Sequence, residues 1–413
     1  MELKKYRLGD IAEIIGGVSY SPKDICTGGI RILRGGNIQN QHIELKTDDV
    51  FLPISYKNNI SQIYVGDTIL VASTGSVDVL GKAATCFQYT EDVQIGAFLR
   101  IIRPKADKYT MLISSALSSD YFKRYIKAQA KGTSINNITL GYLRDFEIYA
   151  PHDFTGLSHL SANIENKICL NRAINDNLEA MAKQLYDYWF VQFDFPNEDG
   201  KPYKSSGGTM VWNEKLKREI PQGWSNGVLS DVANITMGQS PDGSSYNEDG
   251  EGIIFYQGST DFGLRFPDIR QYTTSPSRYA NKGDILMSVR APVGALNIAN
   301  NDCCIGRGLS ALSSKIGSIT HLYYLMNDFR LKFEGMNSAG TTFGSITKDE
   351  LFSLPVIIPT KSVISEFEQV CEPIFDKQMI IGEEINGLTK QRDELLPLLM
   401  NGQATVNYHL SDD

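Results

Sequence analysis

The sequence FTGLSHLSANIENKICLNRAINDNLEAMAKQLYDYWFVQF, residues 154–193, sets the organisation of the whole chain. Steps of three and four residues link one set of its positions, which places them on a single stripe of a long α-helix. At 1.5 Å per residue, roughly 40 residues would span about 60 Å, which is too long for a helix inside one compact domain. The stripe consists of Leu157, Leu160, Ile164, Lys167, Asn171, Ile174, Leu178, Met181, Leu185 and Tyr188.

A second stripe of the same kind runs through residues 361–400. Ile164 and Ile374 lie 210 residues apart, a whole number of heptads, and other pairs repeat this offset. We therefore predict that the two helices pair as a parallel or antiparallel coiled coil, with two unrelated surface helices as the alternative. Asn171 is typical of a polar residue that fixes register, or marks a break in the contact. The second stripe contains Val363, Phe367, Val370, Ile374, Lys377, Ile381, Glu384, Leu388, Gln391, Leu395 and Leu398.

Composition indicates an ordinary globular protein of two or three domains, with 413 residues, 42% hydrophobic and 21% charged. No apolar run approaches the length of a membrane span, and the N-terminus lacks the apolar core of a signal peptide, so we expect a cytoplasmic protein. The six cysteines and five histidines are scattered, which indicates reduced thiols and gives little support to a metal site.

The net charge of −8 at first argues against a nucleic-acid partner. Charge is unevenly distributed, however. Residues 1–150 contain 18 Lys and Arg against 15 Asp and Glu, whereas residues 361–413 contain 4 against 10. If DNA is bound, short local clusters of basic residues must bind it.

Residues 1–153 show a mixed α/β pattern that residues 222–360 repeat in the same order. IRILRGGNI matches IIFYQGSTDFG, VGDTILVAS matches KGDILMSVR, and VQIGAFLRII matches CCIGRGLSAL. We interpret VQIGAFLRIIRP as one strand and residues 109–132 as one helix. The predicted fold class is α+β: two duplicated mixed α/β domains, 1–153 and 222–360, with long helices at 154–193 and 361–402.

Residues 194–221 form an extended, turn-rich linker between the two halves. Large apolar residues in and after it should dock on a domain surface: Trp212, Leu216, Ile220 and Trp224.

The chain resembles the specificity subunit of type I restriction-modification systems over nearly its whole length. The resemblance rests on duplicated Gly-Asp turns before strands, paired Gly-Thr loops, two closing strands that end in proline, and the junction NDNLEAMAKQLYDYWFVQFDF with PYKSSGGTMVWNEKLKREIPQGW. The paired positions are Gly66-Asp67 with Gly283-Asp284, and Gly132-Thr133 with Gly340-Thr341.

The resemblance implies that each globular domain is a target recognition domain for one half of a split DNA sequence. It implies an antiparallel coiled coil that sets the gap between half-sites and docks modification subunits, of which we expect two. Restriction subunits would join through the complex. Methyl transfer and cleavage, with S-adenosylmethionine, Mg²⁺ and ATP, would belong to those partners, so we expect no cofactor in this chain.

Catalytic motifs are missing from the sequence. No N/D-P-P-Y/F loop for base methylation, no G-x-G-x-x-G turn and no G-K-S/T phosphate loop occurs. We therefore expect a non-catalytic chain.

Base-reading side chains should be Arg, Lys, Asn, Gln, Ser or Thr on loops or helix ends. Arg290, directly after the strand of the second Gly-Asp turn, is the strongest candidate for a guanine contact. The candidates are Arg34, Asn37, Ser73, Thr74, Lys82, Thr133, Ser134, Asn136 and Asn137 in the first domain, and Gln257, Ser259, Arg290, Arg307, Thr341 and Thr342 in the second.

Two other functions are compatible with parts of the pattern. A coiled-coil adaptor with two ligand-binding domains would show no sequence-selective DNA binding and no salt-sensitive affinity. A self-sufficient methyltransferase or nuclease would turn over without partners, which the missing motifs disfavour.

Overall fold

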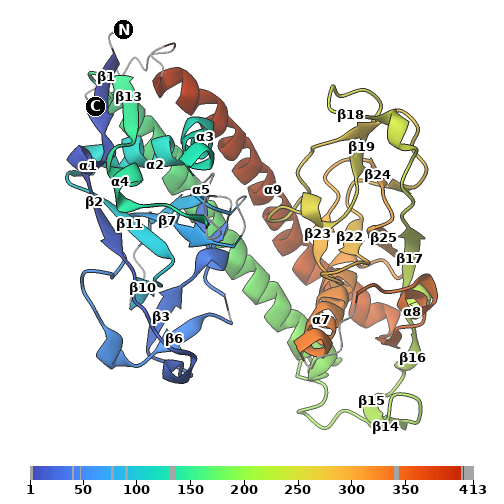
Figure 1. The fold of residues 1–413 in the computed structure, drawn as a ribbon. Helices are drawn as coiled ribbons and strands as arrows, with labels where there is room; N and C mark the ends of the chain where they lie inside the picture. The colour runs from blue at the N-terminus through green and yellow to red at the C-terminus, as the bar shows by residue number, and fades with distance from the viewer. Residues whose placement is uncertain are drawn as a thin grey trace, which may run out of the picture. The chain divides into compact units, whose positions relative to one another are not determined.

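The computed structural model describes residues 3–39, 41–46, 48–75, 79–88, 92–129, 136–338, 344–400 and 403 (Figure 1). The chain divides into two compact units, and each is described by itself. The first comprises Met1–Leu170 with Ile385–Asp413, and the second comprises Asn171–Glu384. Each unit therefore contains one globular domain and part of each long helix.

The first unit is built around an antiparallel sheet in the order β2-β11-β7-β9. A second sheet has the order β10-β3-β6, in which β10 and β3 are parallel. The bounds are β2 Ala12–Gly16, β3 Ile30–Leu33, β6 Val50–Leu52, β7 Thr68–Val71, β9 Ala83–Thr85, β10 Val93–Ile95 and β11 Leu99–Pro104, with short pairs β4 Ile38–Gln39 and β5 His42–Ile43, β8 Ser73–Thr74 and β12 Asn136–Asn137, and β1 Leu3–Arg7 and β13 Glu147–Pro151.

The period-two alternation of the strands divides their side chains between two cores. Leu70 and Ile102 face a core that contains residues of helices α2 (Thr110–Ser118) and α3 (Asp120–Gln129). Their neighbours Ile69 and Ile101 face the core shared with the second sheet.

The single helix expected at residues 109–132 is two helices in the structure, α2 and α3. Ser119, in extended conformation, separates them. Helices α1 (Leu8–Ile11) and α4 (Leu140–Arg144) complete the domain.

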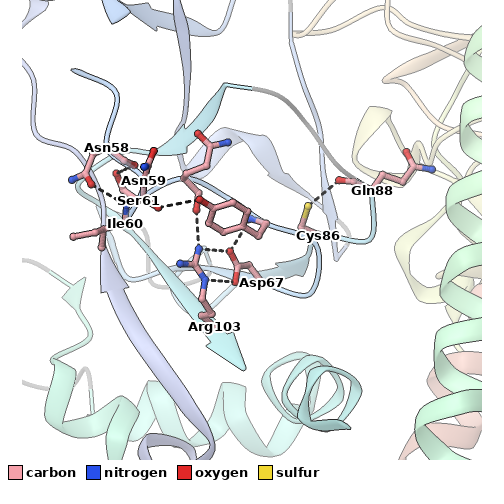
Figure 2. Close-up of polar contacts among 10 residues, drawn as sticks. Asn58, Asn59, Ile60, Ser61, Asp67, Cys86, Gln88 and Arg103 are labelled. Atoms are coloured by element: carbon pink, nitrogen blue, oxygen red, sulfur yellow. Dashed lines mark hydrogen bonds and ion pairs between the residues drawn. The ribbon is translucent and has the colours of Figure 1, made fainter. Parts of the chain in front are cut away.

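The Gly-Asp turn of the first unit holds a buried carboxylate in a fork of charge-assisted hydrogen bonds (Figure 2). Arg103 donates through Nε and Nη2 to the two oxygens of Asp67 at 2.9 and 2.7 Å. The amide of Tyr64 donates to the same carboxylate at 2.8 Å. Such two-pronged pairing fixes β11 against the start of β7 and compensates for burial of the charge.

The second unit repeats this architecture, which confirms the duplication. Its sheet has the order β17-β25-β22-β23, and β19 and β24 form the matching parallel pair. The bounds are β17 Ala233–Met237, β19 Ile253–Tyr256, β22 Ile285–Ser288, β23 Leu296–Ile298, β24 Cys303–Ile305 and β25 Leu309–Ser314, with β16 Ser225–Val228 paired to β26 Pro355–Ile358. Strands β18 Tyr246–Asn247, β20 Tyr272–Thr273 and β21 Tyr279–Ala280 join β19 and β24 in a sheet of order β18-β20-β19-β24-β21. The helices are α6 Leu229–Val232, α7 Ile319–Ser338 and α8 Lys348–Phe352.

The second Gly-Asp turn lacks the arginine of the first. By strand register, Ser313 occupies the place of Arg103, and it accepts a hydrogen bond from Asn234 at 3.2 Å. Among the described residues, the carboxylate of Asp284 accepts a hydrogen bond only from the amide of Asn281, and burial raises the pKa of this group. Both copies contain the turn, because its backbone leads into the strand. The ion pair to an arginine occurs in the first copy, where Arg103 lies beside Asp67.

Helices α5 (Thr155–Tyr186) and α9 (Lys361–Met400) are the long helices that the sequence predicts, and α5 ends in a π-turn at Asp187–Val191. They pack antiparallel. In the second unit Asn171 donates to Glu384, and Glu179 accepts from Gln378, so rising numbers on α5 meet falling numbers on α9.

Except at Asn171, which is buried as predicted, the predicted stripe on α5 lies one residue away from the buried positions. Lys167, Ile174 and Met181 are exposed, so their assignment to the seam is wrong. The half-buried members of the stripe are Leu160, Ile164, Leu178 and Leu185. The side chain of Leu157 lies outside the described residues. The buried positions are Ser161, Glu165, Ile168, Asn171, Asn175, Ala182 and Tyr186.

The stripe on α9 is closer to its prediction. Phe367 and Ile381 are buried, and Ile374, Leu388 and Leu395 are half-buried. The exposed members of the stripe are Val370, Lys377, Glu384, Gln391 and Leu398. The next residue along the chain is buried at four of these places: Cys371, Gln378, Ile385 and Arg392. Buried polar pairs between the two helices explain why the buried positions differ from the predicted stripe. A prediction based on apolar residues cannot locate a seam that consists partly of paired polar groups.

The end of α5 and the linker fold into one aromatic core in the second unit. Ile220 and Trp224 are buried there and Leu216 packs against it, as expected, but Trp212 is 54% exposed on the hairpin of β14 (Met210–Asn213) and β15 (Arg218–Pro221). His321 of α7 is buried in this core, and the centroid of its ring lies 4.5 Å from that of Phe190. The linker is therefore ordered by its apolar anchors.

Candidate nucleic-acid interface

Three backbone hydrogen bonds bring together the loops at one end of the first domain. The amide of Gly96 donates to Leu33 at 2.9 Å, that of Ala72 to Phe98 at 3.0 Å, and that of Ile138 to Ala72 at 2.8 Å. Strand β8 also pairs with β12. These contacts place segments 34–37, 73–75, 96–98 and 136–138 side by side, and we call them the first rim.

The second domain contains the same arrangement. The amide of Gly306 donates to Tyr256 at 2.8 Å, that of Val289 to Gly308 at 2.9 Å, and that of Ile346 to Val289 at 3.0 Å. An isolated bridge joins Arg290 to Ser345. Segments 257–261, 290–291, 306–308 and 344–346 therefore form a second rim, with the same three hydrogen bonds.

The first rim contains several of the proposed DNA-contacting residues. Arg34 and Asn137 are exposed, while Ser73 and Thr74 are half-buried. Lys82 is half-buried beside it and donates to Gln39 at 3.4 Å. Thr133 and Ser134 lie outside the described residues, as does the side chain of Asn136.

Asn37 is an exception, because it is buried and its side chain is fully engaged. Its Oδ1 accepts the amide of Arg34 at 2.8 Å, and its Nδ2 donates to Glu44 O at 2.9 Å and to Asp49 Oδ1 at 2.6 Å. The assignment of Asn37 as a base-reading residue is therefore wrong. The residue instead holds the turn that presents Arg34, since a buried amide must satisfy its hydrogen bonds inside the protein.

The second rim exposes Gln257, Arg290 and Arg307, while Ser259 is half-buried. Asp261 holds this rim as Asn37 holds the first, because its Oδ2 accepts the amide of Gln257 at 2.9 Å. Thr341 and Thr342 lie outside the described residues.

Charge on the rims is locally positive although the chain is acidic overall. Arg34 donates to the backbone carbonyl of Asp48 at 3.3 Å, so that contact leaves its charge uncompensated. Arg290 and Arg307 form no ion pair with any described residue. Exposed, unpaired guanidinium groups are suited to phosphate oxygens and to the acceptor edge of guanine.

Sequence reasoning missed Phe98, which is 68% exposed on the first rim. The single strand expected over residues 93–104 is two strands, β10 and β11, joined by a turn at Gly96–Phe98. Gly96 was the available signal for that turn, because glycine inside a strand pattern often marks a break.

Within the described ranges, no group of three or more His, Cys, Asp or Glu is placed to hold a metal ion. No helix in the described parts of the chain is both long enough and apolar enough to cross a membrane.

A duplicated α+β fold with two matching polar rims and paired long helices defines a class of proteins with two related binding domains in one chain. The family model described as type I restriction modification DNA specificity domain matches residues 1–180 and 221–379. The chain belongs to this family.

Individual relatives agree with the family match. A chain of Methanocaldococcus jannaschii described as a type I restriction enzyme MjaX specificity subunit is 28% identical over 97% of this chain and 93% of its own length. The type I restriction enzyme HindI specificity subunit of Haemophilus influenzae is 23% identical over 71% of this chain and 76% of its own. The crystal structure of a type I restriction-modification S subunit from M. genitalium shares the fold, with a TM-score of 0.53, 15% identity, and coverage of 97% of this chain and 96% of that one.

Proposed function

We propose that this chain reads DNA sequence for a type I restriction-modification complex, with each rim contacting one half of a bipartite, gapped site. The observation that carries the proposal is the duplicated rim, in which the same hydrogen bonds present exposed polar and cationic side chains at matching places. Arg, Asn, Gln and Ser are the residue types that read base edges and bind phosphates. Family membership supports the same function.

The proposal assigns chemistry to partners. Modification subunits, two per chain, would dock along α5 and α9 and carry S-adenosylmethionine, and restriction subunits would bring ATP and Mg²⁺. The antiparallel helices would set the gap between half-sites. The complex would act in the cytoplasm, where it meets DNA.

Methylome mapping tests the proposal directly. A host that carries the gene together with its modification partner should show methylation at one gapped, bipartite motif, and deletion of this gene alone should remove that motif. A methylome that is unchanged by the deletion, while the modification subunit remains active, would contradict the proposal and favour the adaptor.

Arg290 can be tested at the same motif. Arg290→Ala should weaken binding of the assembled complex about tenfold or more, because a guanine contact contributes roughly 1–3 kcal/mol of discrimination, and should relax one half-site only. The matched control is Lys315→Ala, since exposed Lys315 follows β25 at the strand end opposite Gly308. Equal losses in both variants would show a general charge effect and exclude base reading by Arg290.

A further inference from the structure

The turn at Gly96–Phe98 presents one large apolar side chain at the centre of the otherwise polar first rim. Its neighbours in sequence, Ile95 and Leu99, are fully buried in the core between the two sheets. The ring of Phe98 is 68% exposed instead. Burial of a phenyl ring is strongly favourable, so a ring held in solvent forgoes stabilisation that the fold could have used.

Hydrogen bonds from the backbone and from Arg100 hold the backbone of this turn. The carbonyl of Phe98 accepts the amides of Ala72 and Ser73 at 3.0 and 3.1 Å, and the amide of Leu99 donates to Gly96 at 2.9 Å. Arg100 donates through Nη1 to the carbonyls of Ala97 and Leu99 at 2.8 and 2.7 Å. The ring is therefore presented from a fixed backbone, which reduces the entropy lost when it meets a ligand.

The surroundings of the ring indicate what it would meet. Ser73 contacts the turn directly, Asn137 pairs with Ser73 through β12 and β8, and Arg34 follows the strand to which Gly96 is bonded. A protein partner would be expected to meet an apolar patch, whereas hydroxyl, amide and guanidinium groups around a single ring suit phosphates, base edges and the face of a base.

We propose that Phe98 is a wedge that inserts at a base step of the half-site bound by the first rim and unstacks it. This inference rests on the proposed function and extends it. Apolar side chains that enter DNA between base steps open the stack and are selective for steps that unstack easily, such as pyrimidine–purine steps. Phe98 thus contributes to specificity through deformability of the DNA, separately from hydrogen bonds to base edges.

At the place that matches Phe98, the described part of the second rim has no aromatic side chain. Gly308 occupies the place of Phe98, because its carbonyl accepts the amide of Val289 as that of Phe98 accepts the amide of Ala72. Its neighbour Arg307 is exposed and cationic. The two rims therefore differ at this position, and we expect the distortion caused by Phe98 in the half-site that the first rim binds.

Fluorescence of 2-aminopurine tests the wedge, because this base brightens when it is unstacked. The assembled complex would be bound to cognate duplexes in which 2-aminopurine replaces single adenines across both half-sites. Wild type should brighten the probe at one step in one half-site. Phe98→Ala should abolish that signal and weaken binding about tenfold, while Phe98→Tyr, which keeps the ring, should retain both.

Ile54→Ala is the matched control. Ile54 is 73% exposed and follows β6, whose Leu52 pairs with Ile30 at the end of β3 away from the rim, so its loss should leave signal and affinity unchanged. The wedge is overturned if wild type binds its site selectively and Phe98→Ala retains the signal, or if wild type binds selectively and brightens no probe. Absence of selective binding by wild type would instead overturn the proposed function.

Discussion

His321 shows how burial alone changes the chemistry of a side chain. Its ring packs against Tyr186 and Phe190, and its Nδ1 has no hydrogen-bond partner among the described residues. Burial lowers the pKa of His321 to about 3, because the charged imidazolium cannot be solvated in this core. The residue is therefore neutral at any pH at which the protein works, and it serves packing.

This burial predicts a pH dependence of stability in the second unit. Below its unfolded pKa of about 6.5, His321 binds a proton in the unfolded chain and not in the folded one, so stability falls as pH decreases from about 6.5 toward 3. From pH 7.5 to 5.5 the loss from this residue should be about 1.4 kcal/mol. His321→Gln should lack that part of the slope.

Urea titrations followed by tryptophan fluorescence measure this effect, since all three tryptophans, Trp189, Trp212 and Trp224, lie in the second unit. Charged groups that line the adjoining cavity, Asp328, Arg218 and Lys332, remain in both proteins and cancel in the comparison. Exposed His152→Gln in the first unit is the control substitution. Identical slopes in wild type and His321→Gln would contradict a buried neutral histidine.

At the scale of the element, α5 and α9 are held together by buried polar pairs as well as by apolar packing. In the first unit, Arg392 Nη1 lies 3.0 Å from Glu165 Oε1, with side-chain exposures of 5% and 10%. In the second unit, Glu179 accepts from Gln378 and also from Arg265. Pairs of this kind specify one register, because any slip would leave a charge buried without a partner.

The pair between Glu165 and Arg392 yields a prediction. Arg392→Met should destabilise the first unit by about 3–5 kcal/mol, because it strands the Glu165 carboxylate in the interior. Adding Glu165→Leu should restore most of that loss, since an apolar pair avoids the desolvation penalty. Denaturation followed by circular dichroism, arranged as a double-mutant cycle, gives the coupling energy; additive single effects would show that the pair contributes nothing to the seam.

At the scale of the whole molecule, both long helices pass from one unit to the other, α5 between Leu170 and Asn171 and α9 between Glu384 and Ile385. If they set the gap in the DNA site, as proposed, a heptad inserted at both positions should lengthen it. Seven residues add about 10.5 Å of helix, roughly three base pairs of B-DNA.

Methylome mapping of that double insertion should show unchanged half-sites separated by a longer gap. An insertion in α5 alone should abolish methylation, because the polar pairs on α9 would then lie out of register. A change of bases within either half-site would contradict a spacer role for the helices.

The sequence by itself determined the duplication, the two long helices and the family resemblance. Repeated blocks about 210 residues apart are visible without coordinates, since each copy needs the same turns and apolar strands to build the same sheets. The positions of Arg290 and Gln257 on exposed loops also followed from their places just beyond strands.

Only the tertiary structure decided which residues are buried and which loops meet. Asn37 was proposed as a base-reading residue because asparagine can pair with base edges, yet its buried side chain is engaged by Arg34, Glu44 and Asp49. Most of the seam lies one residue from its predicted position because Glu165 and Gln378 are buried against polar partners that a hydrophobic pattern cannot reveal. Phe98 was hidden for the opposite reason: an apolar residue between two buried strands looks like core until the turn that exposes it is known. Burial depends on contacts between distant parts of the chain, and a local pattern carries only one side of each contact.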